Sequence, residues 1–317
     1  MNAVALLDAR WGRVYFAAQA LAGTAWWVGV ALVPFVREAT LGGLPVTLVA
    51  ALDIPLFVVV SGLAAVGIRF CADIATIWTV LVTATMAVYA TVTGLAGWGA
   101  LLMIAASVGS VGALLLVRLN RLPSEWLIVG PFAAREAESA SRPVQLRRTA
   151  VQLVLFWGAA LVVVPAVIAV VEARWGLRWQ LPAAVTIAGG ALLVAASALG
   201  IWSAVVMAGR GDGTPLPMAT ARTLVVSGPY RYVRNPMAVA GITQGVAVGM
   251  LCSSWLVVVY ALCGSLVWNH LIRPWEEKDL LERFGEPYAR YRDRVSVWMP
   301  RRARRTASGI EGSRNVY

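Results

Sequence analysis

Hydrophobic residues along this chain are gathered into long stretches and do not alternate with polar ones. Stretches without Asp, Glu, Lys or Arg cover residues 14–36, 74–117, 149–171, 181–209 and 235–272, and residues 44–68 form another that is interrupted only by Asp53. A bilayer core about 30 Å thick needs roughly 20 apolar helical residues to cross it. Four of the six stretches are long enough for one span each, and 74–117 and 235–272 are long enough for two. The sequence therefore predicts eight membrane spans.

The two double stretches predict different hairpins. Residues 74–117 break at T-G-L-A-G-W-G (93–99), a glycine-rich sequence that indicates a turn between two spans. Residues 235–272 leave only about 17 residues for each leg, so this hairpin must be tight, tilted or partly buried in protein. The predicted fold class is therefore an all-α, polytopic integral membrane protein with about eight transmembrane helices.

The composition and the placement of charge agree with this fold class. Apolar residues make up 59% of the 317 residues and charged residues 14%, compared with about 45–50% and about 25% in soluble proteins. With the N-terminus cytoplasmic, the inner segments hold 24 Lys and Arg residues and the outer segments hold three, Arg37, Arg174 and Arg178. This asymmetry follows the positive-inside rule and places both termini in the cytoplasm, with a bacterial cytoplasmic membrane as the expected location.

The same asymmetry accounts for the formal net charge of +11 without a nucleic-acid partner. No basic motif interleaved with aromatic residues, as in modules that bind RNA or DNA, is present in the sequence. The three cysteines have neither metal-ligand nor redox spacing, and no His, Cys and Asp cluster suggests a metal site. No protein partner is inferred, and the expected partners are membrane lipids and a small lipophilic molecule.

The polar residues divide the chain into four parts. Residues 1–117 form a four-span region of unknown role, and residues 118–148 form a cytoplasmic connector rich in Pro and mixed charge. Residues 149–301 hold four spans and nearly all the candidate chemistry, and residues 302–317 form a basic tail. Asp53, inside a span, is a functional candidate by default. Structural pairing or a protonated acid is the favoured interpretation of Asp53, and a role for the single histidine, His270, stays open.

The densest polar sequence before the last hairpin is L-V-V-S-G-P-Y-R-Y-V-R-N-P, at residues 224–236. Ser227-Gly228-Pro229 is a turn signal, and Asn235-Pro236 indicates the start of the next helix, since Pro suits the first helical turn. A turn at a helix N-terminus offers backbone N–H groups to a carboxylate or a phosphate. An ordinary positively charged cytoplasmic loop that anchors a helix is the alternative.

A second polar sequence follows the hairpin. Glu276 and Glu277 stand just beyond the last span, where a carboxylate requires a partner, and Arg273 or a bound cation would supply one. Further on, Gly285-Glu286-Pro287 should end one helix and begin another. An apolar stripe at helical spacing predicts a cytoplasmic amphipathic helix over the site, with its members at Leu280, Phe284, Tyr288, Tyr291, Val295 and Trp298.

These two motifs together resemble the isoprenylcysteine carboxyl methyltransferase family. G-P-Y-R-Y-V-R-N-P is followed, after a hydrophobic hairpin, by R-x-x-E-E-x-x-L-x-x-x-F-G-x-x-Y-x-x-Y-R-x-x-V-x-x-x-x-P, and the likeness covers about residues 215–301. That family and its phospholipid N-methyltransferase relatives use S-adenosylmethionine within the membrane. The resemblance implies a methyltransferase core at 149–301 that acts on a lipophilic acceptor, with O-methylation of a carboxylate as the expected reaction.

The resemblance also assigns site residues by position. It places the acceptor-binding, catalytic role on Arg273, although Arg273 precedes Glu276 by three residues where the family has four. The positions that it assigns to the cofactor, together with the adjacent second glutamate, are Arg222, Thr223, Leu224, Val225, Tyr230, Arg234, Asn235, Pro236, Met237, Ala238, Glu276 and Glu277.

This sequence departs from the family pattern at three of these positions. Arg222 and Asn235 replace histidines and Ala238 replaces a tyrosine, and each replacement changes or removes a polar contact. The residue types nevertheless suit S-adenosylmethionine. A glutamate can bind its ribose or ammonium group, arginine and backbone N–H groups its carboxylate, and a tyrosine its adenine. Positioning alone can supply roughly 7–11 kcal/mol of a methyl-transfer barrier, so the chemistry requires no metal.

Three alternatives stay open from the sequence. A phospholipid or a thiol acceptor would suit an enzyme of the same superfamily. Membrane sterol reductases of the steroid 5α-reductase type share a similar C-terminal pattern and bind NADPH. A membrane scaffold without catalytic activity is the third, because the R-R-A-R-R sequence at 301–305 could attract anionic lipid at about 1 kcal/mol for each basic residue.

Overall fold

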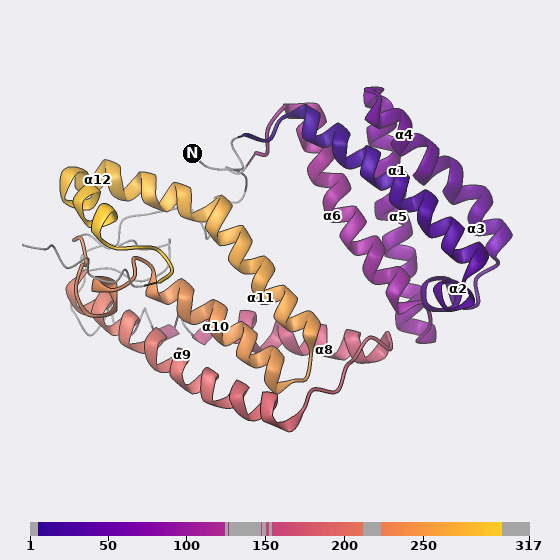
Figure 1. Cartoon of the computed structure of the whole chain (residues 1–317). Coiled ribbons are helices and arrows are strands. Elements are labelled where there is room, and N and C mark those ends of the chain that lie inside the picture. The colour runs from indigo at the N-terminus through magenta and orange to yellow at the C-terminus, as the bar shows by residue number, and fades with distance from the viewer. Residues whose placement is uncertain are drawn as a thin grey trace, which may run out of the picture.

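The computed structural model describes residues 6–123, 126, 147, 150–151, 154–211 and 223–299. Within these ranges every regular element is helical, which confirms the predicted all-α class. Two groups of helices are visible in Figure 1, one formed by α1 to α6 and the other by α8 to α12. The predicted tail at 302–317, its basic cluster at 301–305 and nearly all of the predicted connector lie outside the described residues.

The first group is a bundle in which α1 packs against α4 and α6, and α5 packs against α4 and α6. One span in this bundle becomes π-helical for six residues, Ile54–Val59, a stretch that includes Pro55. In chain order the elements are α1 (Ala9–Leu32), α2 (Pro34–Leu41), α3 (Val46–Asp53), the π-helical η2 (Ile54–Val59), α4 (Val60–Ala65), α5 (Arg69–Thr93) and α6 (Gly97–Leu119).

The second group is built around α10, which packs against both α9 and α11. The last span passes through a π-helical stretch and continues without a break into α12. The elements are η5 (Gly158–Val163), α8 (Val164–Arg174), α9 (Ala183–Arg210), the 3₁₀ turn η7 (Gly228–Arg231), α10 (Pro236–Leu251), α11 (Trp255–Val267), the π-helical η8 (Trp268–Ile272) and α12 (Arg273–Arg294).

The described helices agree closely with the predicted count of eight spans. Seven are long and apolar enough to cross a membrane, and the shorter apolar helix Pro236–Leu251 is α10. Its 16 residues are few for a span, and small residues let it lie close to its neighbours. A Cβ atom added at Gly245 would approach Ala261 of α11 to 2.8 Å. The hairpin is therefore tightly packed in protein, as its length predicted.

The two groups meet through loops that were predicted to share the outer side. Arg174, at the end of α8, donates from Nε to the carbonyl of Thr91 at 2.7 Å, and the Trp175 indole donates to the Thr91 hydroxyl at 3.0 Å. Trp98 stacks on Trp255 with 5.9 Å between ring centroids. These contacts join the end of α5 and the start of α6 to the α8–α9 and α10–α11 connections.

Candidate functional site

The candidate site begins where the chain returns to the end of α9. Thr223 donates from its hydroxyl to the carbonyl of Arg210 at 2.6 Å and from its backbone nitrogen to Gly211 at 3.2 Å. The segment then passes Val225, whose side chain is buried, and reaches η7. Thr223 to Val225 therefore lie at the base of the site, while Arg222, predicted to contact a cofactor, falls outside the described residues.

The turn at η7 forms as the sequence predicted. Gly228 has a φ of 59°, a conformation that side chains disfavour, and Pro229 follows it inside the 3₁₀ turn. Tyr230 is buried at 5% exposure. Burial raises the pKa of the Tyr230 phenol well above its usual value, so this hydroxyl is a neutral donor at physiological pH.

Asn235 caps helix α10, which starts at Pro236. The side-chain oxygen of Asn235 accepts a hydrogen bond from the backbone nitrogen of Ala238 at 3.0 Å. This is an ordinary helix N-cap, a role for which Asn is among the preferred residues. Met237 and Ala238 belong to the first turn of α10. The asparagine that replaces the family's histidine therefore has a structural function of its own, which the sequence comparison had not indicated.

Helix α12 folds over this turn after a kink at Gly285, where φ is 54° and ψ is −132°. The kink confirms the break predicted at Gly285-Glu286-Pro287. Beyond it, Tyr288 is 2% exposed, and Tyr291 donates from its hydroxyl to the carbonyl of Tyr230 at 2.6 Å. Tyr291, a member of the predicted apolar stripe, thus joins α12 to η7, whereas the last two members, Val295 and Trp298, lie beyond the end of α12 at Arg294.

The chain beyond α12 turns back across the site. The backbone nitrogen of Arg234 donates to the carbonyl of Ser296 at 2.9 Å. Trp298 donates from its indole to the Asn269 side-chain oxygen at 3.1 Å and packs edge-on against Trp268, with 5.4 Å between centroids. These contacts tie the segment after α12 both to the turn before α10 and to η8. Sequence reasoning did not identify Asn269 and Ser296, because neither belongs to a recognisable motif.

Two arginines from distant parts of the chain converge on one carboxylate. Arg234 Nη1 lies 3.0 Å from Glu277 Oε1, and Arg273 Nη1 lies 3.3 Å from the same oxygen. The Arg234 side chain is 14% exposed, and its Nε is fully buried without a hydrogen-bond partner among the described residues. Arg273 also donates from Nε to the carbonyl of Asn269 at 3.3 Å. A buried N–H donor without a partner requires an explanation, and a bound water or ion is one of those that structures commonly show.

Glu276 is the more unusual of the two glutamates. It lies four residues beyond Ile272, where the uncharged stretch ends, and is therefore outside the span. The pKa of Glu276 is raised to about 7. Burial is the largest cause and the neighbouring charge of Glu277 adds to it, while a hydrogen bond from Trp268 and the charge of Arg273 act in the opposite direction. A carboxyl group whose pKa lies near neutral pH, at the edge of a cluster of charged residues, is a functional-site candidate.

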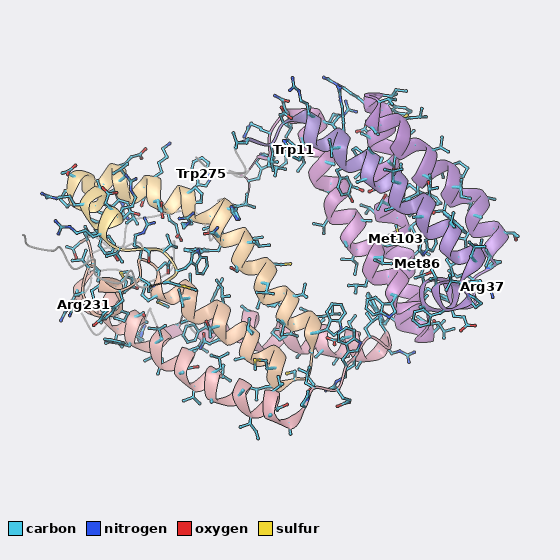
Figure 2. The ribbon with its side chains drawn as sticks, in the orientation of Figure 1. Trp11, Arg37, Met86, Met103, Arg231 and Trp275 are labelled. Carbon is cyan, nitrogen blue, oxygen red and sulfur yellow. The ribbon has the colours of Figure 1, made fainter. Side chains whose placement is uncertain are left out.

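The remaining predicted features have simpler environments. His270 lies 3.2 Å from the Asn269 amide through Nε2. Among the described residues, no group of three or more His, Cys, Asp or Glu side chains could hold a metal ion. In Figure 2, Arg231 and Trp275 both belong to the helix group that contains the site, and Trp275 lies in the first turn of α12.

Asp53 lies in the other helix group and is buried at 7% exposure. It accepts hydrogen bonds from two indoles, Trp27 Nε1 on α1 and Trp78 Nε1 on α5, each at 3.0 Å. Its partners therefore come from neighbouring helices and are not basic. Asp53 therefore has the structural pairing that the sequence favoured. The sequence did not indicate its partners, because they lie on other helices.

Taken together, the described residues form an integral membrane protein with a polar site at the end of its last hairpin. Residues 184–287 match the family model described as "Phospholipid methyltransferase". This segment runs from the first turn of α9 to the kink in α12. The matching family is part of the superfamily of membrane methyltransferases that also includes isoprenylcysteine carboxyl methyltransferase, the family that the two sequence motifs resemble.

Among curated proteins, the Cobalt-zinc-cadmium resistance protein CzcN of Cupriavidus metallidurans is 31% identical to this chain over 132 residues. The aligned part covers 41% of this chain and 55% of that protein, so the chain spans about half the length of this relative. No solved structure matches the chain. The family whose model matches is made up of methyltransferases.

Proposed function

We propose that this protein is an S-adenosylmethionine-dependent methyltransferase that acts on a lipophilic acceptor at the cytoplasmic face of the membrane. The cluster of Arg234, Arg273 and Glu277, which lies in the segment that matches the methyltransferase family model, supports this function best. The cofactor would supply an electrophilic methyl group on a sulfonium sulfur. The protein then has to bind the cofactor and the acceptor, orient them toward each other and exclude water.

The residues present fit the polar groups of such a cofactor. The unpartnered Nε of Arg234 can donate to a carboxylate, and the buried Ser296 hydroxyl, also unpartnered among the described residues, can bind a second polar group. Glu276 can accept from an ammonium or a ribose hydroxyl, and a bound cation would return its pKa toward the usual value. The predicted contacts from Thr223, Leu224, Val225, Asn235, Pro236, Met237, Ala238 and Glu277 remain part of this proposal.

Arg273 is the proposed ligand of an anionic acceptor. Its described contacts use Nε and Nη1, and its side chain is 26% exposed at the point where the last span ends. An acceptor carboxylate could therefore reach the guanidinium while its apolar tail stays in lipid. Charge is neutralised when such an anion attacks a sulfonium, and a dry site favours that change. O-methylation of a lipophilic carboxylate is the reaction that we propose first.

A phospholipid headgroup amine is the second candidate acceptor, because the matching family model is that of phospholipid methyltransferases. Incubation of purified protein with labelled S-adenosylmethionine and matched amphiphiles separates the two candidates. A fatty carboxylate that gains a base-labile methyl ester supports the first, and a phosphatidylethanolamine that gains a base-stable methyl group supports the second.

The cofactor is tested by calorimetric titration with S-adenosylhomocysteine and, separately, with NADPH. We expect binding of the first only. Glu276→Gln and Tyr230→Ala should each weaken it at least tenfold, about 1.4 kcal/mol. Glu282→Gln on the same helix, whose side chain is 67% exposed, is the matched control and should bind normally. NADPH binding would instead support the reductase alternative, and unchanged affinity in both site variants would place the pocket elsewhere.

A further inference from the structure

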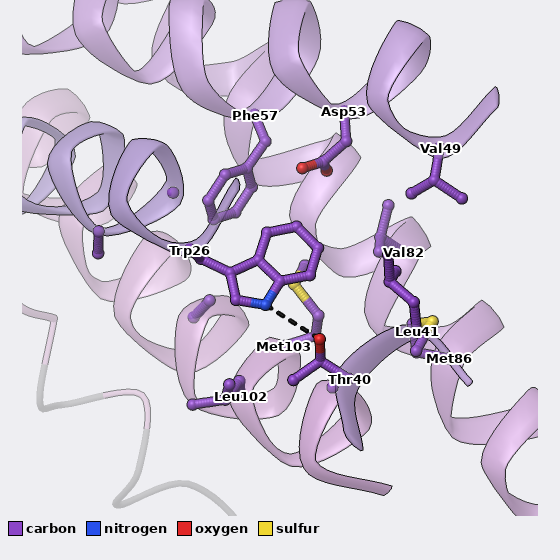
Figure 3. Close-up of a pocket in the computed structure, with 14 residues that line it drawn as sticks. Trp26, Thr40, Leu41, Val49, Asp53, Phe57, Val82, Met86, Leu102 and Met103 are labelled. Carbon is purple, nitrogen blue, oxygen red and sulfur yellow. Dashed lines mark hydrogen bonds between the residues drawn. The ribbon is translucent and has the colours of Figure 1, made fainter. Parts of the chain in front are cut away.

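A cavity of about 240 Å³ lies inside the first helix group, away from the proposed methyltransferase site. Residues from α1, α2, α3, η2, α5 and α6 line it, and it is partly open to the surroundings. Figure 3 shows the Asp53 carboxylate facing the rings of Phe57 and Trp26 across this space, with Met86 and Met103 nearby. The chemistry of its lining indicates what it can hold.

One of the spans that line the cavity contains a π-helical stretch. Asp53 ends α3, and Phe57 follows four residues later in the π-helical η2, so that both side chains line the cavity. Such π-helical insertions occur frequently at functional sites. On the facing helix, Gly23 makes room for Phe57, since an added Cβ would lie 3.0 Å from its ring.

The other hydrogen-bonding groups among these lining side chains already have partners. Trp26 donates from its indole to the Thr40 hydroxyl at 3.1 Å, and that hydroxyl donates to the Val36 carbonyl at 2.6 Å. Asp53 accepts one indole N–H on each oxygen. A carboxylate offers about four lone-pair sites, so each oxygen retains capacity for another donor. The hydrogen-bonding capacity left in the cavity is therefore that of the Asp53 carboxyl oxygens, which accept.

Asp53 takes part in none of the ion pairs formed by the described residues. The Trp26 and Phe57 rings and the polarisable sulfurs of Met86 and Met103 form the rest of the lining. Aromatic faces attract cations, most strongly where water is excluded. We propose that this cavity is a binding site for a lipophilic amine. Its protonated nitrogen binds Asp53 among the aromatic rings, and its alkyl chain extends toward the lipid.

The test is equilibrium binding of radiolabelled octylamine to the full chain in nanodiscs, with empty nanodiscs subtracted for partitioning into lipid. We expect saturable binding of about one molecule per chain, weakened at least tenfold by Asp53→Asn. Octanol, the neutral analogue, should not compete. Asp73→Asn is the matched control because it removes a carboxylate of the same helix group, one paired with Arg118, and should bind like the natural protein.

A second variant blocks the space without altering the carboxylate. Leu102 lines the cavity and is 52% exposed, so Leu102→Trp can be accommodated and should abolish saturable binding. If Asp53→Asn does not fold, this variant and the comparison of octylamine with octanol decide the result. Wild-type protein without saturable octylamine binding would overturn the proposal. So would equal binding by a folded Asp53→Asn protein, unchanged binding by Leu102→Trp, or equal competition by octanol.

Discussion

Arg234 Nη1 lies 3.0 Å from Glu277 Oε1 and so joins the turn before α10 to the first turns of α12. The two residues are separated along the chain by the whole α10–α11 hairpin. The same glutamate oxygen is shared with Arg273 on its own helix. This shared carboxylate is the point at which the two sequence motifs become one site.

Replacement of Arg234 by Gln should loosen that connection. The pair is neither fully buried nor exposed, so its loss should cost about 1–3 kcal/mol, between the values for surface and buried pairs. We expect a lower thermal midpoint and weaker S-adenosylhomocysteine binding. A double-mutant cycle with Glu277→Gln isolates the pair, and strictly additive effects of the two changes would show that the contact contributes nothing.

The pKa of Glu276, raised to about 7, predicts how cofactor binding depends on pH. A cationic ligand group favours the ionised carboxylate, so below pH 7 binding must first remove a proton and the affinity falls. Between pH 7.5 and pH 6 the affinity for S-adenosylhomocysteine should drop about tenfold. Glu276→Gln should remove most of this dependence, and a wild-type affinity that is constant over this range would contradict the prediction.

The same raised pKa affects the stability of the free protein in the opposite direction. Because the folded pKa exceeds the unfolded one, the neutral carboxyl group favours folding below the unfolded value of about 4.5. That contribution is lost as the pH rises through 7. Thermal midpoints of the ligand-free protein, compared with those of Glu276→Gln across this window, measure the effect.

Tyr291→Phe removes a single hydrogen bond, from the Tyr291 hydroxyl to the Tyr230 carbonyl. A hydrogen bond of this kind contributes about 1 kcal/mol, and its loss should lower the thermal midpoint and loosen the turn. Tyr232→Phe is the control, since Tyr232 is adjacent to the turn but 51% exposed. Equal effects of the two changes would mean that the contact with Tyr230 has no special role.

Arg273→Lys tests the proposed acceptor. Lysine lacks the planar fork that matches a carboxylate, so we expect loss of most turnover on an acidic amphiphile while cofactor affinity is retained. Measurement of methyl transfer and of S-adenosylhomocysteine binding on the same preparation separates the two roles. A wild-type rate would mean that Arg273 only pairs with Glu277, and Arg222 or Arg231 would then be examined.

The orientation in the membrane is tested by reporter fusions. The predicted arrangement has both termini in the cytoplasm, and fusions after Gly97 and after Arg174 should report the outside. Those after Arg135 and at the C-terminus should report the inside. In the structure the first two sites lie close together, since an added Cβ at Gly97 would touch the Trp175 carbonyl. A C-terminus outside the cell would place the proposed site on the wrong face.

The sequence by itself determined the membrane class, the approximate number of spans, and the turns and helix ends at the site. Uncharged stretches that are long enough to span a bilayer form helices there, because every backbone polar group must be hydrogen-bonded within the segment. The turn at Gly228-Pro229, the helix start at Pro236 and the kink at Gly285 were equally readable. Each follows from a conformation that only a few residue types adopt readily.

The tertiary structure alone decided which side chains meet. The convergence of Arg234 and Arg273 on Glu277, and the pairing of Asp53 with two tryptophans of other helices, depend on how the helices pack. Asn235, aligned with a cofactor-binding histidine of the family that the motifs resemble, caps α10. The cavity beside Asp53 arises where a π-helical stretch and Gly23 face each other. Local sequence patterns cannot encode such contacts, because they join residues that are far apart along the chain.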